Sequence, residues 1–148
     1  MIFEGYTTSV VFESVLSDAP AFKKFRFIAG NLSLDFCNSV GGKRETIARE
    51  NLHSYPHFLS WCEQTGLVRG GEVHRLTEQN DLDPGKGAAV LNRALVLREA
   101  IYRIFFAMAK VSAPSIGDLN LLNSELALAL SRLRNSIRGS PRQLATNR

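Results

Sequence analysis

Four polar side chains at mostly apolar positions are the residues of this chain that could do chemistry. Asp35 and Asn38 lie in the segment NLSLDFCNSV, where an apolar run surrounds the acid, and Arg44 follows soon after a Gly-Gly turn. Arg98 lies much later, in a stretch whose residues one and two helical turns away are apolar. A charge that is buried without a partner is costly. We therefore predict that Asp35 and Arg98 meet as a buried ion pair, with Arg44 as the competing partner of Asp35.

These side chains support two interpretations. A carboxylate accepts the guanidinium fork through two parallel hydrogen bonds, so the first is a structural ion pair that ties two helices together. The second is a ligand-binding pocket, in which Asp35, Asn38, Arg44 and Arg98 present polar groups to a small molecule within an apolar surround. The residues alone do not decide between the two.

Metal and nucleophile chemistry has weaker support. His53 and His57 are four residues apart and Cys62 follows, but Ser54-Tyr55-Pro56 is expected to begin a helix between the histidines, which would then not share a face. Nothing in the spacing places an orienting imidazole beside Cys37 or Cys62. We therefore predict no metal site, no cofactor and no catalytic residue.

Composition and length indicate one soluble domain. The chain has 148 residues, of which 45% are hydrophobic and 22% charged, as in ordinary globular proteins. No apolar run approaches the length of a membrane span, and Glu4 and Glu13 interrupt the N-terminal segment, which argues against a secretory signal. Two cysteines are too few for a disulfide framework and suit a reducing compartment, although one disulfide stays open. We predict a cytoplasmic protein with no membrane partner.

The basic charge is concentrated at one end. The net charge is +4, and the segment from Arg132 to Arg148 contains five arginines and no acid. Taking these five from the 18 cations leaves 13 against 14 anions in residues 1–131. We predict at most weak, sequence-independent nucleic-acid contact by this tail, and a solvated chain end is the more frequent explanation.

Helical periodicity predicts the longest elements. Apolar residues at spacings of 3, 4 and 7 predict a helix over Gly87–Lys110. Ser115 and Asp118 form a capping-box pattern that opens a last helix. The buried line of this helix is predicted to be Leu119, Leu122, Leu126 and Leu130.

Shorter elements are also predicted. Asn31 can cap a short helix, although alternating apolar residues there also allow a strand, and Ser54 can begin a helix that stops at Gly66. Further predictions are strands at Phe25–Ile28 and around Thr8–Phe12, a short helix at Glu72–Gln79 and a loop at residues 80–87. The sequence thus predicts a mainly α, compact helical domain with a small β element.

Four segments in order carry a family resemblance. LSLDFCNSVGGKR, SYPHFLSWCEQTGLV, LREAIYRIFFAMA and DLNLLNSELALAL resemble the bacterial ABATE-domain proteins, also described as CGNR zinc-finger or stress-induced transcription regulators. The resemblance spans residues 25–130 and keeps the order and spacing of the segments. The recurring positions of the family fall on Asp35, Asn38, Arg44, Trp61, Arg98, Glu99 and Asn123. The resemblance implies structural roles for Trp61, Glu99 and Asn123.

The resemblance also implies a domain organisation. Residues 1–24 would be a weakly patterned lead-in, 25–131 the ABATE-like helical domain, and 132–148 a basic tail. ABATE proteins usually continue into a zinc finger with two cysteine pairs, the proposed DNA-binding part. Here the chain ends RNSIRGSPRQLATNR, with no cysteine. Truncation, a degenerate copy and a shifted reading frame are open explanations for the missing finger.

The resulting functional hypothesis is a regulatory domain of a stress-induced transcription regulator that senses an unidentified small-molecule ligand. The first alternative is a structural or dimerisation module with an inert ion pair, acting as a homodimer. A small enzyme is the third alternative.

Overall fold

A computed structural model describes residues 24–44, 46 and 48–138. Five helices and one two-stranded antiparallel sheet make up this described part, and the predicted mainly α fold with a small β element is confirmed. In chain order the elements are α1 (Leu32–Cys37), β1 (Val40–Gly41), β2 (Arg49–Glu50), α2 (Tyr55–Gln64), α3 (Gly70–Leu82), α4 (Pro84–Ala109) and α5 (Ile116–Arg138).

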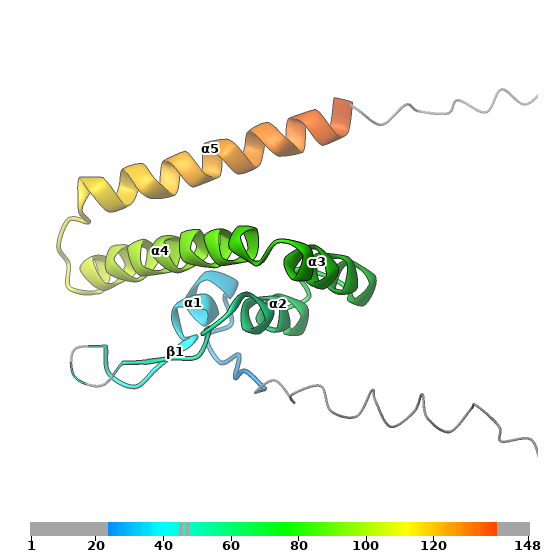
Figure 1. The fold of residues 1–148 in the computed structure, drawn as a ribbon. Coiled ribbons are helices and arrows are strands. Elements are labelled where there is room, and N and C mark those ends of the chain that lie inside the picture. The colour runs from blue at the N-terminus through cyan, green and yellow to red at the C-terminus, as the bar shows by residue number, and fades with distance from the viewer. Residues whose placement is uncertain (1–23, 45, 47, 139–148) are drawn as a thin grey trace, which may run out of the picture.

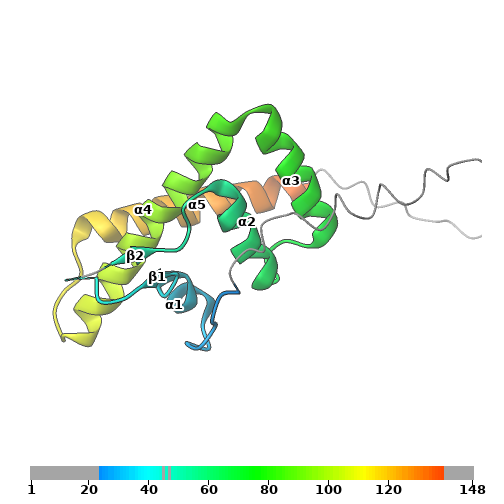
Figure 2. The same ribbon diagram turned by 60° about the horizontal axis from the view of Figure 1, so that its bottom comes forward.

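Helix α4 is the centre of the arrangement. It packs against α1, α2, α3 and α5. Figure 1 shows α5 as a layer on one side of α4, with α1, α2 and β1 on the other side. In Figure 2, α1 and both strands gather beside the C-terminal half of α4, while α2 and α3 lie toward its beginning. Residues of α4 are therefore in reach of both the strands and the short helix α1.

Helix α1 forms where Asn31 can cap it. The Asn31 Oδ1 accepts hydrogen bonds from the backbone N–H groups of Ser33, at 2.9 Å, and Leu34, at 3.4 Å. These groups would otherwise lack partners at the first turn of a helix. The helical alternative for this segment is therefore confirmed over the strand.

Helix α2 begins and ends as predicted. Ser54 is extended at the N-cap position and Pro56 lies in the first turn, where a missing N–H group costs nothing. After Thr65 the chain leaves the helix through Gly66, whose φ of +76° is readily adopted only by glycine.

Two local predictions are wrong. Residues 80–87 form no loop, because α3 continues to Leu82 and α4 begins at Pro84, leaving Asp83 alone between them. The Asp83 carboxylate accepts the N–H of Lys86 and caps α4, so the Pro-Gly pair belongs to a helix start. Phe25–Ile28 is not a strand in the described structure, and the strand predicted around Thr8–Phe12 lies outside the described residues.

The core lies between α2, α4 and the segment that enters α2. Leu52, Trp61, Cys62 and Leu91 form its buried cluster. The Trp61 ring lies 4.9 Å from the ring of Phe36, measured between centroids, and is 3% exposed. Trp61 therefore joins α1 to α2 in the core.

Helix α5 is rolled differently from the prediction. Its inward side carries Asp118 and Glu125, which pair with Arg103 and Arg93 of α4. Leucines of the predicted buried line occupy the neighbouring side, and Leu126 remains 54% exposed. The prediction of a buried line is wrong for its second half because the ion pairs, rather than the leucines, face α4.

Candidate functional site

Asp35 is buried, as predicted, but its partner is the backbone. Its Oδ1 accepts hydrogen bonds from the N–H groups of Ile28, at 2.9 Å, and Ala29, at 3.0 Å. These groups belong to the segment that leads into α1. The prediction of an Asp35–Arg98 ion pair is therefore wrong: local N–H groups satisfy the carboxylate before any helix from farther along the chain does.

Arg98 is also buried, as predicted, and it binds different acids. Its Nη1 and Nη2 donate to the two carboxylate oxygens of Glu50 in β2, at 3.0 and 2.5 Å. Its Nη1 also donates to the Ser39 Oγ at 2.9 Å, and its Nε to Glu99 at 3.0 Å. The two parallel hydrogen bonds to Glu50 have the geometry that favours arginine over lysine.

Arg44 pairs with Glu99 and not with Asp35. Its Nη1 lies 2.7 and 2.6 Å from the two Glu99 oxygens, and its Nη2 donates to the backbone carbonyl of Cys37 at 2.6 Å. The guanidinium also lies over the Tyr102 ring, 4.1 Å from its centroid, where a cation is attracted to the aromatic face.

Glu50, Arg98, Glu99 and Arg44 thus form a continuous ion-pair network of alternating charge. It connects β2, α4 and the turn after β1. The sequence prediction assigned no role to Glu50. One signal for it is local: Glu50 precedes the buried Leu52 by two residues, a spacing that puts both side chains on one side of an extended chain.

The electrostatics of the network follow from burial and pairing. Burial alone would raise the pKa of Glu50, but the hydrogen bonds and charge of Arg98, with the N–H groups of Asn51 and Leu52, hold the pKa below its ordinary value of 4.5. Burial alone would lower the pKa of Arg98, and the carboxylates of Glu50 and Glu99 raise it instead. Glu50 and Arg98 are therefore both charged at neutral pH.

Stability is expected to fall in acid through Glu50. Because its pKa is lower in the folded than in the unfolded chain, its contribution is complete above about 4.5 and is lost as the pH falls through the folded value. When urea unfolding is measured from neutral pH down to pH about 3, the free energy of unfolding should fall less for Glu50→Gln than for the wild type. Glu63→Gln, at an exposed acid of α2, is the control and should keep the wild-type slope; an unchanged slope in Glu50→Gln would contradict the assignment.

Two cavities flank the C-terminal end of α1. The Trp61 cavity, of about 170 Å³, is lined by Lys24, Phe25, Arg26, Asp35, Asn38, Ser39, Asn51 and Trp61. The Tyr102 cavity, of about 250 Å³, is lined by Cys37, Asn38, Val40, Gly42, Lys43, Arg44 and Tyr102.

The structure therefore divides the predicted ligand-binding set. Asn38 lines both cavities, Asp35 lines only the Trp61 cavity and Arg44 only the Tyr102 cavity. Arg98 lines neither of them, because Ser39, Glu50 and Glu99 surround its guanidinium. Of the residues with implied structural roles, Trp61 lies in the core, Glu99 joins the two arginines, and Asn123 is exposed on α5.

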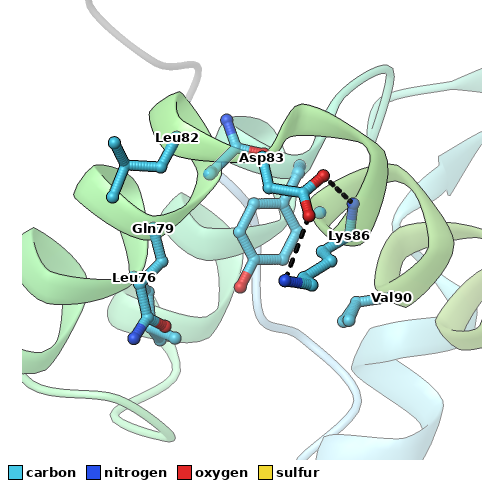
Figure 3. A pocket seen from close by; sticks show the side chains of 9 residues that line it. Leu76, Gln79, Leu82, Asp83, Lys86 and Val90 are labelled. Carbon is cyan, nitrogen blue, oxygen red and sulfur yellow. Dashed lines mark hydrogen bonds and ion pairs between the residues drawn. The ribbon is translucent and has the colours of Figure 1, made fainter.

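A larger cavity of about 460 Å³ lies where α3 meets α4 (Figure 3). Leu76, Leu82 and Val90 provide apolar walls. The charged groups at its rim pair with each other, the Lys86 Nζ lying 3.1 Å from an Asp83 oxygen. This cavity contains none of the predicted site residues.

The cysteines and histidines are the remaining candidates for covalent or metal chemistry in the described part of the chain. Cys37 and Cys62 are buried and free, and burial raises the pKa of Cys62 to about 11, so its thiol is protonated at neutral pH. His53 precedes α2 and His57 lies within it, and their rings meet edge-on with centroids 5.8 Å apart. No group of three or more metal-ligating side chains occurs among the described residues.

Fold and site together define a small helical domain whose central helix holds a sheet and a turn through partly buried ion pairs. The sequence model of the ABATE family, described as "Putative stress-induced transcription regulator", matches residues 30–147. The chain belongs to this family, and the match contains all seven recurring residues and α5. No curated protein and no solved structure matches the chain. Among the described helices, none is long and apolar enough to cross a membrane.

Proposed function

We propose that this chain is the regulatory domain of a transcription regulator and that it senses a small anionic metabolite at the Tyr102 cavity. The family description supports the regulatory class. The observation that carries the ligand proposal is Asn38, which ends α1 and lines the cavities on both sides of it.

Asn38 is available to a ligand, in contrast to its predicted companions. Its side chain is exposed, and it forms no hydrogen bond with the described residues beyond those of its backbone. An amide offers both donors and an acceptor, which suits recognition of a polar group. The carboxylate of Asp35, by comparison, already binds two N–H groups.

The charge of the Tyr102 cavity favours an anion. Lys43 and Arg44 both line it, and none of its described lining residues is acidic. Arg44 is held in place by Glu99 and Tyr102, while Lys43 is exposed and forms no ion pair with a described residue. A volume of about 250 Å³ suits a small carboxylate or phosphate ester.

The ion-pair network provides a route from the cavity to α4. A ligand anion that binds Arg44 competes with Glu99 for the guanidinium, and Glu99 also binds Arg98. Ligand binding would therefore change the pairing that holds β2 to α4. Glu99 is bound to Arg44 in one arrangement and displaced from it in the other. A ligand can shift the balance between these arrangements only if it binds one of them more tightly than the other.

A thermal-shift screen with small carboxylates and phosphate esters tests this proposal. We expect at least one anion to raise the melting temperature of the wild type. At a ligand concentration of a hundred times the dissociation constant, binding adds about 2.7 kcal/mol to the free energy of unfolding. Asn38→Ala and Lys43→Gln should each lose most of this response, whereas Asn92→Ala, at an exposed asparagine of α4, should keep it. A wild type that no anion stabilises, or an equal response in all three variants, would contradict the proposal.

A structural module is the second candidate, and one observation favours it. No buried side-chain nitrogen or oxygen among the described residues lacks a hydrogen-bond partner. A network that is fully satisfied without a ligand can serve to hold the fold alone. The absence of any stabilising anion in the screen would support this candidate.

A further inference from the structure

Five leucines run along one side of α5 and remain accessible to solvent. This leucine line is Leu119, Leu122, Leu126, Leu130 and Leu133, and its last three members are 54, 50 and 57% exposed. Leu119 and Leu122 are half-buried. A continuous apolar stripe on a surface marks an interaction site more often than isolated apolar residues do.

Two ion pairs fix the roll of α5 so that the leucine line does not face α4. Arg93 binds both oxygens of Glu125, at 2.7 and 2.5 Å, and Arg103 binds Asp118 near the start of the helix. Both acids lie on the side of α5 that meets α4. At about 100° per residue, the leucine line is centred roughly a quarter turn from that side. Figure 1 shows α5 as an outer layer of the domain, in keeping with one free side.

The spacing of the leucine line is symmetric about Leu126. The other leucines lie four and seven residues from it, before it and after it. In an antiparallel pair of such helices centred on Leu126, each Leu119 meets a Leu133 and each Leu122 meets a Leu130. A self-complementary stripe of this kind is what a two-fold interface between identical chains requires.

We propose that the leucine line binds the same surface of a second copy of this chain, with the two α5 helices antiparallel and the two-fold axis at Leu126. This goes beyond the proposed ligand function and does not depend on it. Spacings of three and four residues at the contact are those with which two helices interdigitate over their length.

The charges of α5 favour the antiparallel arrangement. Its acids, Asp118 and Glu125, are already paired with arginines of α4. The sequence of its C-terminal part adds three arginines, at positions 132, 134 and 138, and no acid after Glu125. Antiparallel helices keep these positive ends apart and oppose their dipoles, whereas parallel helices would bring the like charges together.

Molar mass in solution tests the association. Light scattering on the full chain across a dilution series should give twice the 16.4 kDa of one chain. Leu126→Asp should give a single-chain mass and an unchanged circular dichroism spectrum. Leu67→Asp, at an equally exposed leucine in the loop after α2, should remain a dimer. A monomeric wild type, or a Leu126→Asp variant that stays dimeric, would overturn the proposal.

Cross-linking tests the register. With a short bis-maleimide, Leu126→Cys should form a covalent dimer, because the two positions meet at the axis. Leu119→Cys and Leu133→Cys should each fail alone, since each lies about 20 Å from its counterpart, but should cross-link when the two variants are mixed. The native cysteines are buried, so the wild type supplies the background. Efficient cross-linking of Leu119→Cys alone would indicate a parallel pair and overturn the proposed geometry.

Discussion

Arg98→Ala is expected to lower the free energy of unfolding by about 3 kcal/mol. The substitution removes a guanidinium that is 3% exposed and leaves Glu50 and Ser39 without its hydrogen bonds. It also leaves Arg44 as the only described arginine bound to Glu99. Leaving an acid without its buried partner lowers the free energy of unfolding by more than the intact pair contributes to it. Urea unfolding followed by circular dichroism measures the change.

A matched control separates this effect from the general loss of an arginine. Arg93 forms an ion pair with Glu125 of similar geometry, but its side chain is 46% exposed. Arg93→Ala should therefore destabilise the fold much less than Arg98→Ala does. Adding Glu50→Gln to Arg98→Ala should recover part of the loss, because the unpaired charge is then removed. Equal costs for the two arginines, or no recovery in the double variant, would contradict a network that depends on the buried Arg98.

Trp61→Ala is expected to cost about 3–5 kcal/mol. Its ring packs on Phe36 of α1, stacks with Phe58 of α2 and lies edge-on to Phe27 of the incoming segment. Truncation opens a cavity at the point where these three parts meet. Trp61→Phe keeps an aromatic ring, so its loss in free energy of unfolding should be less than half that of Trp61→Ala.

Circular dichroism is the measurement for this series, because Trp61 is the only tryptophan of the chain and fluorescence would be lost with it. Leu67→Ala, in the loop after α2, is a control for truncation of an exposed side chain and should change stability by less than about 0.5 kcal/mol. A cost for Trp61→Ala within that range would place the indole outside the core.

The sequence predicted burial better than pairing. Asp35 and Arg98 each stand out because a charge interrupts an apolar pattern, and both are buried. The pattern shows that each charge needs a partner but not which one, since N–H groups, Ser39 and two acids all compete. Asp35 binds N–H groups only six and seven residues away, whereas Arg98 reaches Glu50 across 48 positions. Such distant contacts depend on how the elements pack.

Helix ends likewise separate local features, which the sequence predicts, from features that depend on packing. The caps at Asn31 and Ser54 are local signals, and both helices begin there. The segment of residues 80–87 was wrongly predicted as a loop because Pro84 and its glycines are typical of loops and also of a first helical turn. Periodicity likewise placed the leucines of α5 on one side of the helix, but it could not show that Asp118 and Glu125 would face α4 instead.

The short sheet has a consequence for the order in which the chain acquires structure. With two residues in each strand, it is too small to persist alone. Its attachments, from Arg98 to Ser39 and Glu50, span 59 and 48 positions. During synthesis both strands leave the ribosome well before the arginine that anchors them, and closing such long loops is entropically costly. The hairpin should therefore be among the last parts to settle, after the central helix has docked.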